Sequence, residues 1–195
     1  MGSNPKDKGL KLMQSYKKLF TYWYALIIYD LTVDFCGRWI KSWKLREQMS
    51  GAARSGKQNI VEGSEGMKTS LKNGIRLTNV AKASLEELLA DYEDFLRQRE
   101  LPQWDKDDPR VVSLRRRTAA LVRNLSNLSN LSNLRGQLPL PEEPEEAANL
   151  LLTFCHQATY LLNKQVEALE RKHQTEGGYT EKLYRKRQEY RRIHK

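Results

Sequence analysis

The sequence predicts an all-α protein, an antiparallel up-and-down four-helix bundle with an inserted segment before the fourth helix and a basic C-terminal extension. Apolar residues recur at helical spacing over long segments, and no segment shows the alternation of a strand. The 6 prolines and 11 glycines are sparse and cluster at a few joints between these segments. A chain of 195 residues is long enough for one domain with a core of its own.

The first helix is expected over residues 16–45, after a flexible basic tail at residues 1–15. Its apolar residues cover more than one stripe of the helix surface, which is typical of a helix buried on more than one side. We therefore expect its second side to face another subunit. Asp30 and Asp34 lie on one face, four residues apart, and we expect them to pair with a basic residue of a neighbouring helix.

The second and third helices are expected to pack very closely. The second covers residues 47–65 and is rich in small residues, and Gly63 and Gly66 mark its end. The third begins at a cap, Thr69 or Ser70, and runs to Arg99. Small residues on both helices let the two backbones approach, and we expect Asn59 and Glu62 to be buried there and to need hydrogen-bond partners.

Residues 102–145 are an insertion between the third and fourth helices, within a bundle domain that spans residues 16–176. Pro109 suits the first position of a short helix. An Asn-Leu-Ser triplet repeat follows at residues 124–134, and leucine at every third position gives an α-helix no stable stripe. We therefore expect residues 124–144 to be mobile.

The fourth helix is expected over residues 145–174. Glu145 and Glu146 in its first turn, and basic residues in its last turn, suit the helix dipole. Gly177 and Gly178 end it, and residues 177–195 form the basic extension.

Charge is strongly polarised along the chain, whose net charge is +10 and whose pI is about 9.6. Residues 110–135 hold six arginines and no acid, and residues 179–195 hold seven Lys or Arg against two acids. Residues 83–108 hold nine acids against three cations. Such a balance favours a polyanionic partner, or the stacking of the basic part of one subunit on the acidic part of another.

Several classes of site and location are not expected. The apolar runs are too short to span a membrane, no apolar signal sequence is seen, and Cys36 and Cys155 are isolated, so we expect a cytoplasmic protein without disulfides. Glu170 and His173 form one Glu-x-x-His pair, whereas a di-iron bundle needs two such pairs and further glutamates, so no metal site is expected. With three histidines there is no credible catalytic arrangement, and we expect no enzyme activity and no cofactor. His156 is interpreted as a core or interface residue.

Two motifs on the second and third helices carry a family resemblance. The first motif is matched by Ala52, Ser55, Asn59, Ile60, Glu62 and Gly63, and the second by Ala81, Ser84, Leu85, Glu87 and Leu88. In this pattern the chain resembles the four-helix bundle proteins first noticed as reading frames inside bacterial 23S rRNA intervening sequences. The resemblance covers about residues 19–100, and the extension after Gly177 looks like the suffix of one branch of that family. Gly51 and Gly56 replace the Arg and Ile of the family pattern.

The resemblance implies a role without fixing one. Members are similar to the accessory variability protein of diversity-generating retroelements, a homopentameric barrel that binds nucleic acid and the element's reverse transcriptase. The leading hypothesis is therefore a non-enzymatic, homo-oligomeric accessory protein, a pentamer by resemblance, that binds RNA or DNA and scaffolds a reverse transcriptase with its template. The alternative is a protein-interaction scaffold with no nucleic-acid role. Ser55, Asn59, Glu62, Gly63, Ser84 and Glu87 are interpreted as structural rather than ligand-binding residues.

Candidate nucleic-acid contacts come from the two basic clusters. They are Arg115, Arg116 and Arg117 in the insertion, and Lys182, Arg185, Lys186, Arg187, Arg191 and Arg192 in the extension. Cations interleaved with tyrosines suit backbone neutralisation and base stacking. The arginine triplet is equally a phosphate clamp or a solvated helix face. The extension is equally a nucleic-acid contact or an amphipathic helix that packs on a partner subunit.

Overall fold

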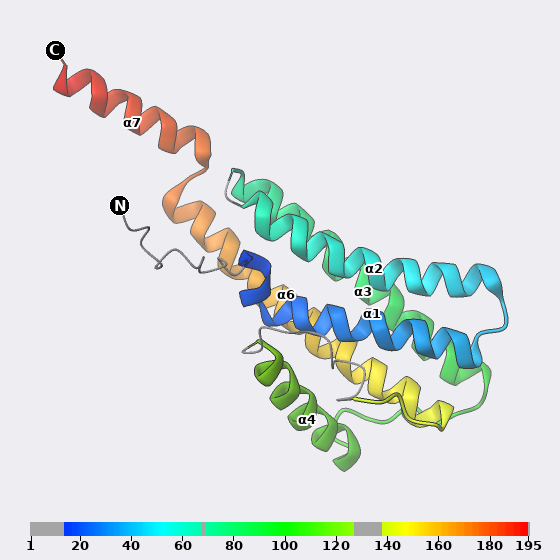
Figure 1. Ribbon diagram of the computed structural model, residues 1–195. Coiled ribbons are helices and arrows are strands. Elements are labelled where there is room, and N and C mark those ends of the chain that lie inside the picture. Colours follow the sequence, from blue (N-terminus) through cyan, green and yellow to red (C-terminus); the bar gives the residue numbers. More distant parts are fainter. Residues whose placement is uncertain (1–13, 68, 127–137, 195) are drawn as a thin grey trace, which may run out of the picture.

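The computed structural model describes residues 14–67, 69–126 and 138–194, and in this part of the chain it is all-helical, with no strand. Its elements are η1 (Ser15–Lys18), a 3₁₀ helix, and then α1 (Phe20–Trp39), α2 (Trp43–Gly66), α3 (Leu71–Gln98), α4 (Pro109–Ser126), α6 (Pro144–Glu176) and α7 (Tyr179–Ile193) (Figure 1). The all-α prediction is confirmed. The four-helix count is not, because the described residues form six α-helices.

The single helix predicted over residues 16–45 is broken twice. The chain leaves η1 through Leu19, and α1 ends at Trp39 because Ile40 turns to an extended conformation and is buried. Ser42 then begins α2, since its Oγ accepts a hydrogen bond from the Leu45 amide over 3.3 Å. The cap sets the true start of α2, four residues before the predicted one.

The other helix boundaries follow their predicted signals. Ser70 caps α3, with its Oγ accepting from the Asn73 amide over 3.2 Å. Pro109 is the first residue of α4, and the Asp108 side chain accepts from the Arg110 amide over 2.8 Å. Gly177, at a φ of 70°, ends α6 in a conformation that favours glycine.

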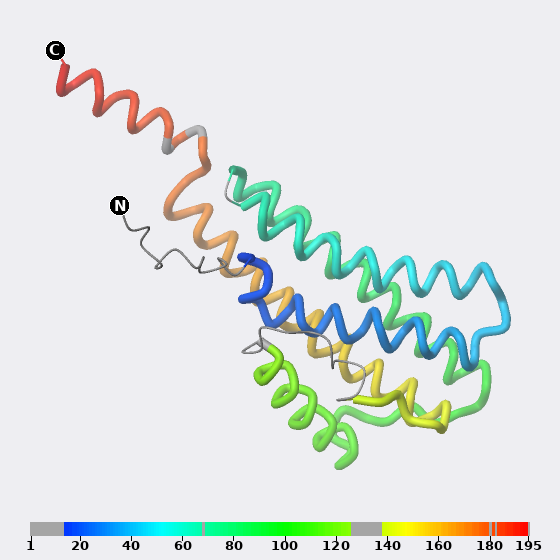
Figure 2. Tube along the Cα trace, viewed as in Figure 1, coloured from blue at the N-terminus to red at the C-terminus, as the bar shows by residue number. Residues whose placement is uncertain are grey.

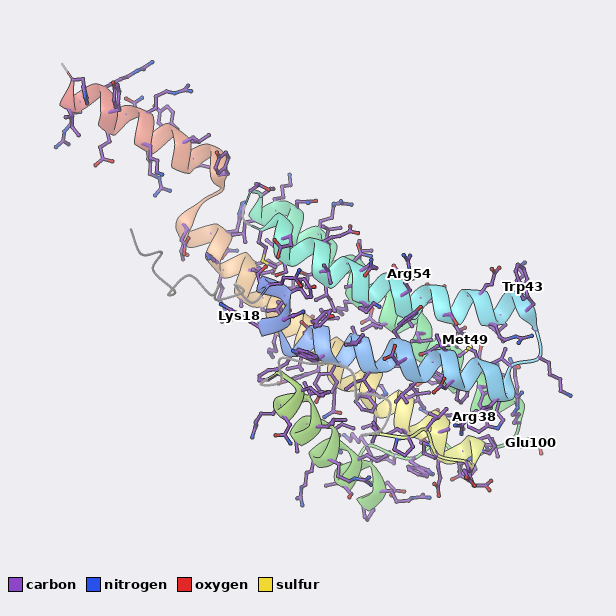
Figure 3. The ribbon with its side chains drawn as sticks, viewed as in Figure 1. Lys18, Arg38, Trp43, Met49, Arg54 and Glu100 are labelled. Carbon is purple, nitrogen blue, oxygen red and sulfur yellow. The ribbon has the colours of Figure 1, made fainter. Side chains whose placement is uncertain are left out.

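Helices α1, α2, α3 and α6 surround one apolar core. α2 packs on α3, α3 on α6, and α1 on both α2 and α6 (Figure 2). Phe35 and Tyr92 are fully buried with ring centroids 5.1 Å apart, and the Tyr92 hydroxyl lies 2.8 Å from the Thr32 hydroxyl. Met49, labelled in Figure 3, reaches into the same region from α2 and is also fully buried.

α4 covers the second side of α1. Ile27 and Leu31 of α1 line a small pocket with Leu125 of α4 and with Leu140, and all four residues are buried. The inference that this side of α1 faces another subunit is therefore wrong for these residues, because the inserted segment supplies the cover. Phe20 and Val33 remain exposed.

Residues near the two ends of the segment predicted to be mobile pack on the rest of the protein. Leu125 and Leu140 are 2 % and 5 % exposed, and Arg38 of α1 donates to the carbonyl oxygens of Leu140 and Pro141 over 3.3 and 3.2 Å. The segment is thus packed on α1 at these positions, which argues against the predicted mobility there. Residues 127–137, with most of the Asn-Leu-Ser repeat, and residues 1–13 of the predicted tail lie outside the described residues.

Candidate nucleic-acid interface

The basic extension forms a helix that stands apart from the rest of the molecule. α7 leaves α6 at Gly177 and Gly178 and projects beyond the bundle, and no other described helix packs along it (Figure 1). At its start the Gly178 amide donates to the Glu181 carboxylate over 2.8 Å. Hydrogen bonds from the backbone amides of Glu181 and Gly178 lower the pKa of Glu181, so this carboxylate remains charged at the positive end of the helix.

The cations of α7 are available to a partner. Arg185, Lys186, Arg187, Arg191 and Arg192 are all exposed, and nitrogen-tipped side chains extend from α7 into solvent (Figure 3). Among these five cations, Arg185 donates to the Glu176 carbonyl oxygen over 3.1 Å, which ties α7 to the end of α6. Lys182 lies within α7, but its side chain is outside the described part of the chain.

Aromatic rings lie among these cations. Tyr179, Tyr184 and Tyr190 are 56 %, 63 % and 63 % exposed, and the Tyr190 ring stacks on His194 with centroids 4.1 Å apart. Exposed rings beside cations are what a single strand needs for stacking and charge neutralisation. Leu183 and Ile193 are exposed too, and with Tyr179 and Tyr190 they recur at steps of four, seven and three residues. One face of α7 is therefore rich in exposed apolar side chains, and the exposed Lys186 lies among them.

Three adjacent arginines of α4, Arg115 to Arg117, lie away from α7 and differ in their exposure. Arg116 and Arg117 are exposed, whereas Arg115 is half-buried and donates to the carbonyl oxygen of Lys106. α4 lies against α1 and α6, away from the projecting α7 (Figure 1). The structure thus places the two predicted basic clusters on separate parts of one chain.

The family-motif residues divide into a packed set and an exposed set. Ser55 and Ser84 join α2 to α3 through hydroxyls 2.9 Å apart. The side-chain Nδ2 of Asn59 donates to the Ser55 carbonyl oxygen over 2.9 Å. At Gly63, an added Cβ would lie 3.4 Å from the Gly74 carbonyl oxygen, so the two backbones come as close as the small residues predict. Glu62 and Glu87 are exposed, which corrects the expectation that Glu62 is buried and needs a partner.

Lys57 of α2 reaches across to α1, the helix that carries Asp30. The Lys57 ammonium of α2 lies 4.1 Å from the centroid of the Tyr29 ring on α1. Burial lowers the pKa of Lys57, and the nearby charge of Asp30 acts in the opposite sense. Lys57 therefore joins α2 to α1 through the Tyr29 ring, and the expected ion pair of Asp30 or Asp34 with a basic residue stays a prediction.

His156 is exposed on α6 and lines a surface pocket, so it is not a core histidine, and its interpretation as an interface residue stays a prediction. Among the described residues no group of three or more His, Cys, Asp or Glu is arranged to hold a metal ion. Within the same residues, no helix combines the length and the apolarity that crossing a bilayer requires. The pocket could not be predicted from the sequence because its walls come from segments far apart in the chain. Trp104 and Asn149, for example, are 45 residues apart and are joined by a hydrogen bond.

Comparisons with protein-family models, with curated proteins and with solved structures return no match to this chain. Function is therefore argued from the geometry of the described residues and from the motif resemblance.

Proposed function

We propose that this chain is a non-enzymatic, homo-oligomeric accessory protein that binds RNA or DNA through α7. The observation that carries the proposal is α7 itself, an arm with exposed arginines, lysines and tyrosines on which no other described helix packs. A basic helix held clear of the bundle can follow a phosphate backbone while its rings stack on unpaired bases. Nothing in α7 has the form of a module that reads base edges in a groove, so weak sequence preference is expected.

The contacts among α1, α2, α3 and α6 support the finer part of the fold proposal. Their closed ring of neighbours, together with the hydroxyl contact between Ser55 and Ser84, agrees with the antiparallel four-helix bundle that the motif resemblance implies. α4 and α7 are then additions to that bundle. By the same resemblance we propose a pentamer and a reverse transcriptase as a further partner.

A salt-dependent binding titration tests α7 against a matched control. The α7 variant carries Lys186→Gln, Arg187→Gln and Arg191→Gln, and the control carries Lys41→Gln, Lys44→Gln and Lys72→Gln, three exposed cations of the bundle. Each variant loses three positive charges, so only the position of the charges differs. Fluorescence anisotropy with single-stranded RNA starts at about 50 mM salt, where phosphate contacts are weakly screened.

We expect the α7 variant to bind more weakly and its salt slope to shrink. Each phosphate contact to a single strand contributes about 0.7 to the slope of log affinity against log salt, so three lost contacts reduce it by about 2. The control should keep the slope of the unchanged protein. Equal losses in the two variants would show that net charge alone attracts the strand, and the assignment to α7 would be wrong.

The runner-up function is a protein-interaction scaffold. It is favoured by the exposed apolar residues Tyr179, Leu183, Tyr190 and Ile193, which share one face of α7 and suit packing on a partner subunit. Light scattering on the chain truncated after Glu176 distinguishes the two roles. Loss of assembly with no change in RNA affinity supports the scaffold, and loss of RNA affinity at unchanged mass supports the nucleic-acid role.

A further inference from the structure

A pocket of about 540 Å³ opens where the connection after α3 meets α4 and α6. Its volume falls in the range of sites that hold small organic molecules, about 300–1,000 Å³. Its walls are made by Gln103, Trp104, Asp105, Lys106, Val111, Arg115, Asn149, Leu152, Thr153 and His156. The pocket is separate from α7, so nothing proposed for α7 requires it.

One wall of the pocket is held in place by partly buried hydrogen bonds. The Trp104 amide donates to Asn149 Oδ1 over 2.8 Å, and the Trp104 indole Nε1 donates to Glu145 Oε1 over 2.7 Å. Asn149 is 2 % exposed, and its Nδ2 donates to the Pro102 and Glu145 carbonyl oxygens. The guanidinium of Arg110 lies 3.9 Å from the Trp104 ring centroid. The aromatic wall therefore exists before any ligand arrives.

Three nitrogen-bearing side chains from different segments line this pocket. Arg115 comes from α4, His156 from α6 and Lys106 from the connection. One guanidinium nitrogen of Arg115 donates to the Lys106 carbonyl oxygen and so joins α4 to the connection after α3. The other N–H groups of the guanidinium can donate to a ligand. Within the described part of the chain, no hydrogen bond or ion pair is formed by the Lys106 ammonium or the His156 ring.

The lining favours an anion over a cation. Asp105 is its one carboxylate in the described chain, and Asp105 Oδ1 already accepts from the Asp107 amide over 2.9 Å. The lining also carries the positive charges of Lys106 and Arg115, and a fork of guanidinium donors matches the oxygens of a phosphate group. Val111 and Leu152 add apolar surface next to the Trp104 ring, which suits a flat, weakly polar group.

We propose that this pocket binds a phosphorylated nucleoside, with the phosphate on Arg115, Lys106 and His156 and the base against the Trp104 side of the pocket. The same chemistry is presented by a free nucleoside monophosphate and by the 5′-phosphorylated end of a strand. Arg115, one of the residues first assigned to a general phosphate clamp, has a different role here from its neighbours Arg116 and Arg117, which are exposed.

Calorimetric titration of the full chain with AMP tests the proposal, and the matched pair Arg115→Gln and Arg116→Gln locates the site. The α7 variant with three glutamines serves as the starting protein, so that failure of nucleic-acid binding by α7 cannot be mistaken for failure of this pocket. We expect Arg115→Gln to weaken AMP binding about tenfold or more, the usual effect of removing a hydrogen bond to a charged group. Arg116→Gln should leave it unchanged, since it removes the same charge one residue away.

His156→Ala provides a second variant, because His156 is exposed and its ring forms no hydrogen bond or ion pair with the described residues. It should weaken AMP binding while circular dichroism stays the same. Adenosine and inorganic phosphate should each bind much more weakly than AMP. Tighter binding of a 5′-phosphorylated than of a 5′-hydroxyl oligonucleotide would identify a strand end as the source, and equal binding of these two would identify the free nucleotide.

The proposal is overturned by any of three results. The first is no heat of binding at about 5 mM AMP, beyond the range of weak specific affinities. The second is equal loss in Arg115→Gln and Arg116→Gln, which would mean non-specific attraction. The third is inorganic phosphate or adenosine binding as tightly as AMP, which would show that half of the ligand makes no contact.

Discussion

The contact between α2 and α3 at Gly56 predicts a large penalty for one added methyl group. A Cβ on Gly56 would lie 2.7 Å from Leu85 Cδ2 and 2.9 Å from Leu85 Cγ, and real Cβ atoms essentially never come so near. Leu85 is fully buried, so it cannot turn away into solvent. Overpacking of this kind costs about 1–3 kcal/mol, whereas replacing glycine by alanine within a helix gains about 1 kcal/mol.

Gly51 is the matched control for Gly56 because it lies in the same helix. Among the described residues nothing stands within 4 Å of a Cβ added there. Gly51→Ala should therefore stabilise the fold by about 1 kcal/mol, and Gly56→Ala should be less stable than Gly51→Ala by about 1–3 kcal/mol. Urea unfolding followed by circular dichroism measures both at one protein concentration.

A double variant adds a stricter check. Leu85→Ala is destabilising alone because it leaves a cavity, and Gly56→Ala partly fills that space, so the two changes should cost less together than their sum. Equal stability of Gly51→Ala and Gly56→Ala, or simple additivity with Leu85→Ala, would refute the close approach of α2 and α3.

Two further predictions rest on buried ionisable groups. Burial, with added repulsion from Glu87 and Asp94, raises the pKa of Asp91 from 3.8 to about 6, so the folded state should lose stability as pH rises from about 4 to about 6 and stay less stable above that. Asp91→Asn should flatten this pH profile and stabilise the fold at pH 8 by about 1–2 kcal/mol, after allowance for partial exposure of the side chain. An unchanged midpoint of urea unfolding in Asp91→Asn at pH 8 would contradict this prediction. Burial raises the pKa of Cys36 to about 11 and that of Cys155 well above its usual range, so neither thiol should react with a disulfide reagent at pH 8 until the protein unfolds, and rapid labelling of the native chain would show that these sites open.

The sequence was sufficient for the helices whose signals are local. Ser70 and Pro109 fix their helix starts through caps and ring geometry that depend on a few neighbouring residues. The close packing of α2 on α3 was also predicted, because small residues recur on both helices, and the contact between Ser55 and Ser84, 29 residues apart, agrees with it. The break after Trp39 was missed, since burial of Ile40 outweighs the helical pattern that continues through it.

The sequence was sufficient to predict the two basic clusters but not their positions relative to each other. The arginines of α4 and the cations of α7 were visible as clusters, yet their separation depends on the turn at Gly177 and on the packing of α4 against α1 and α6. The pocket beside Trp104 was not predictable, because nothing in the sequence shows that the connection after α3 lies against Asn149 and His156. Long-range polar contacts of this kind leave no periodic trace in a sequence.

The position of α4 restricts how this chain can change over generations. An insertion that forms a separate surface loop can be gained or lost in one step, because the domain beneath it is already polar. Here the segment covers Ile27 and Leu31 of α1 with apolar side chains of its own, such as Leu125. Its loss would leave an apolar strip facing water, so deletion must be accompanied by polar replacements on α1 or by a new covering partner. The presence of the inserted segment and the apolar surface of α1 that it covers are therefore inherited together in this fold.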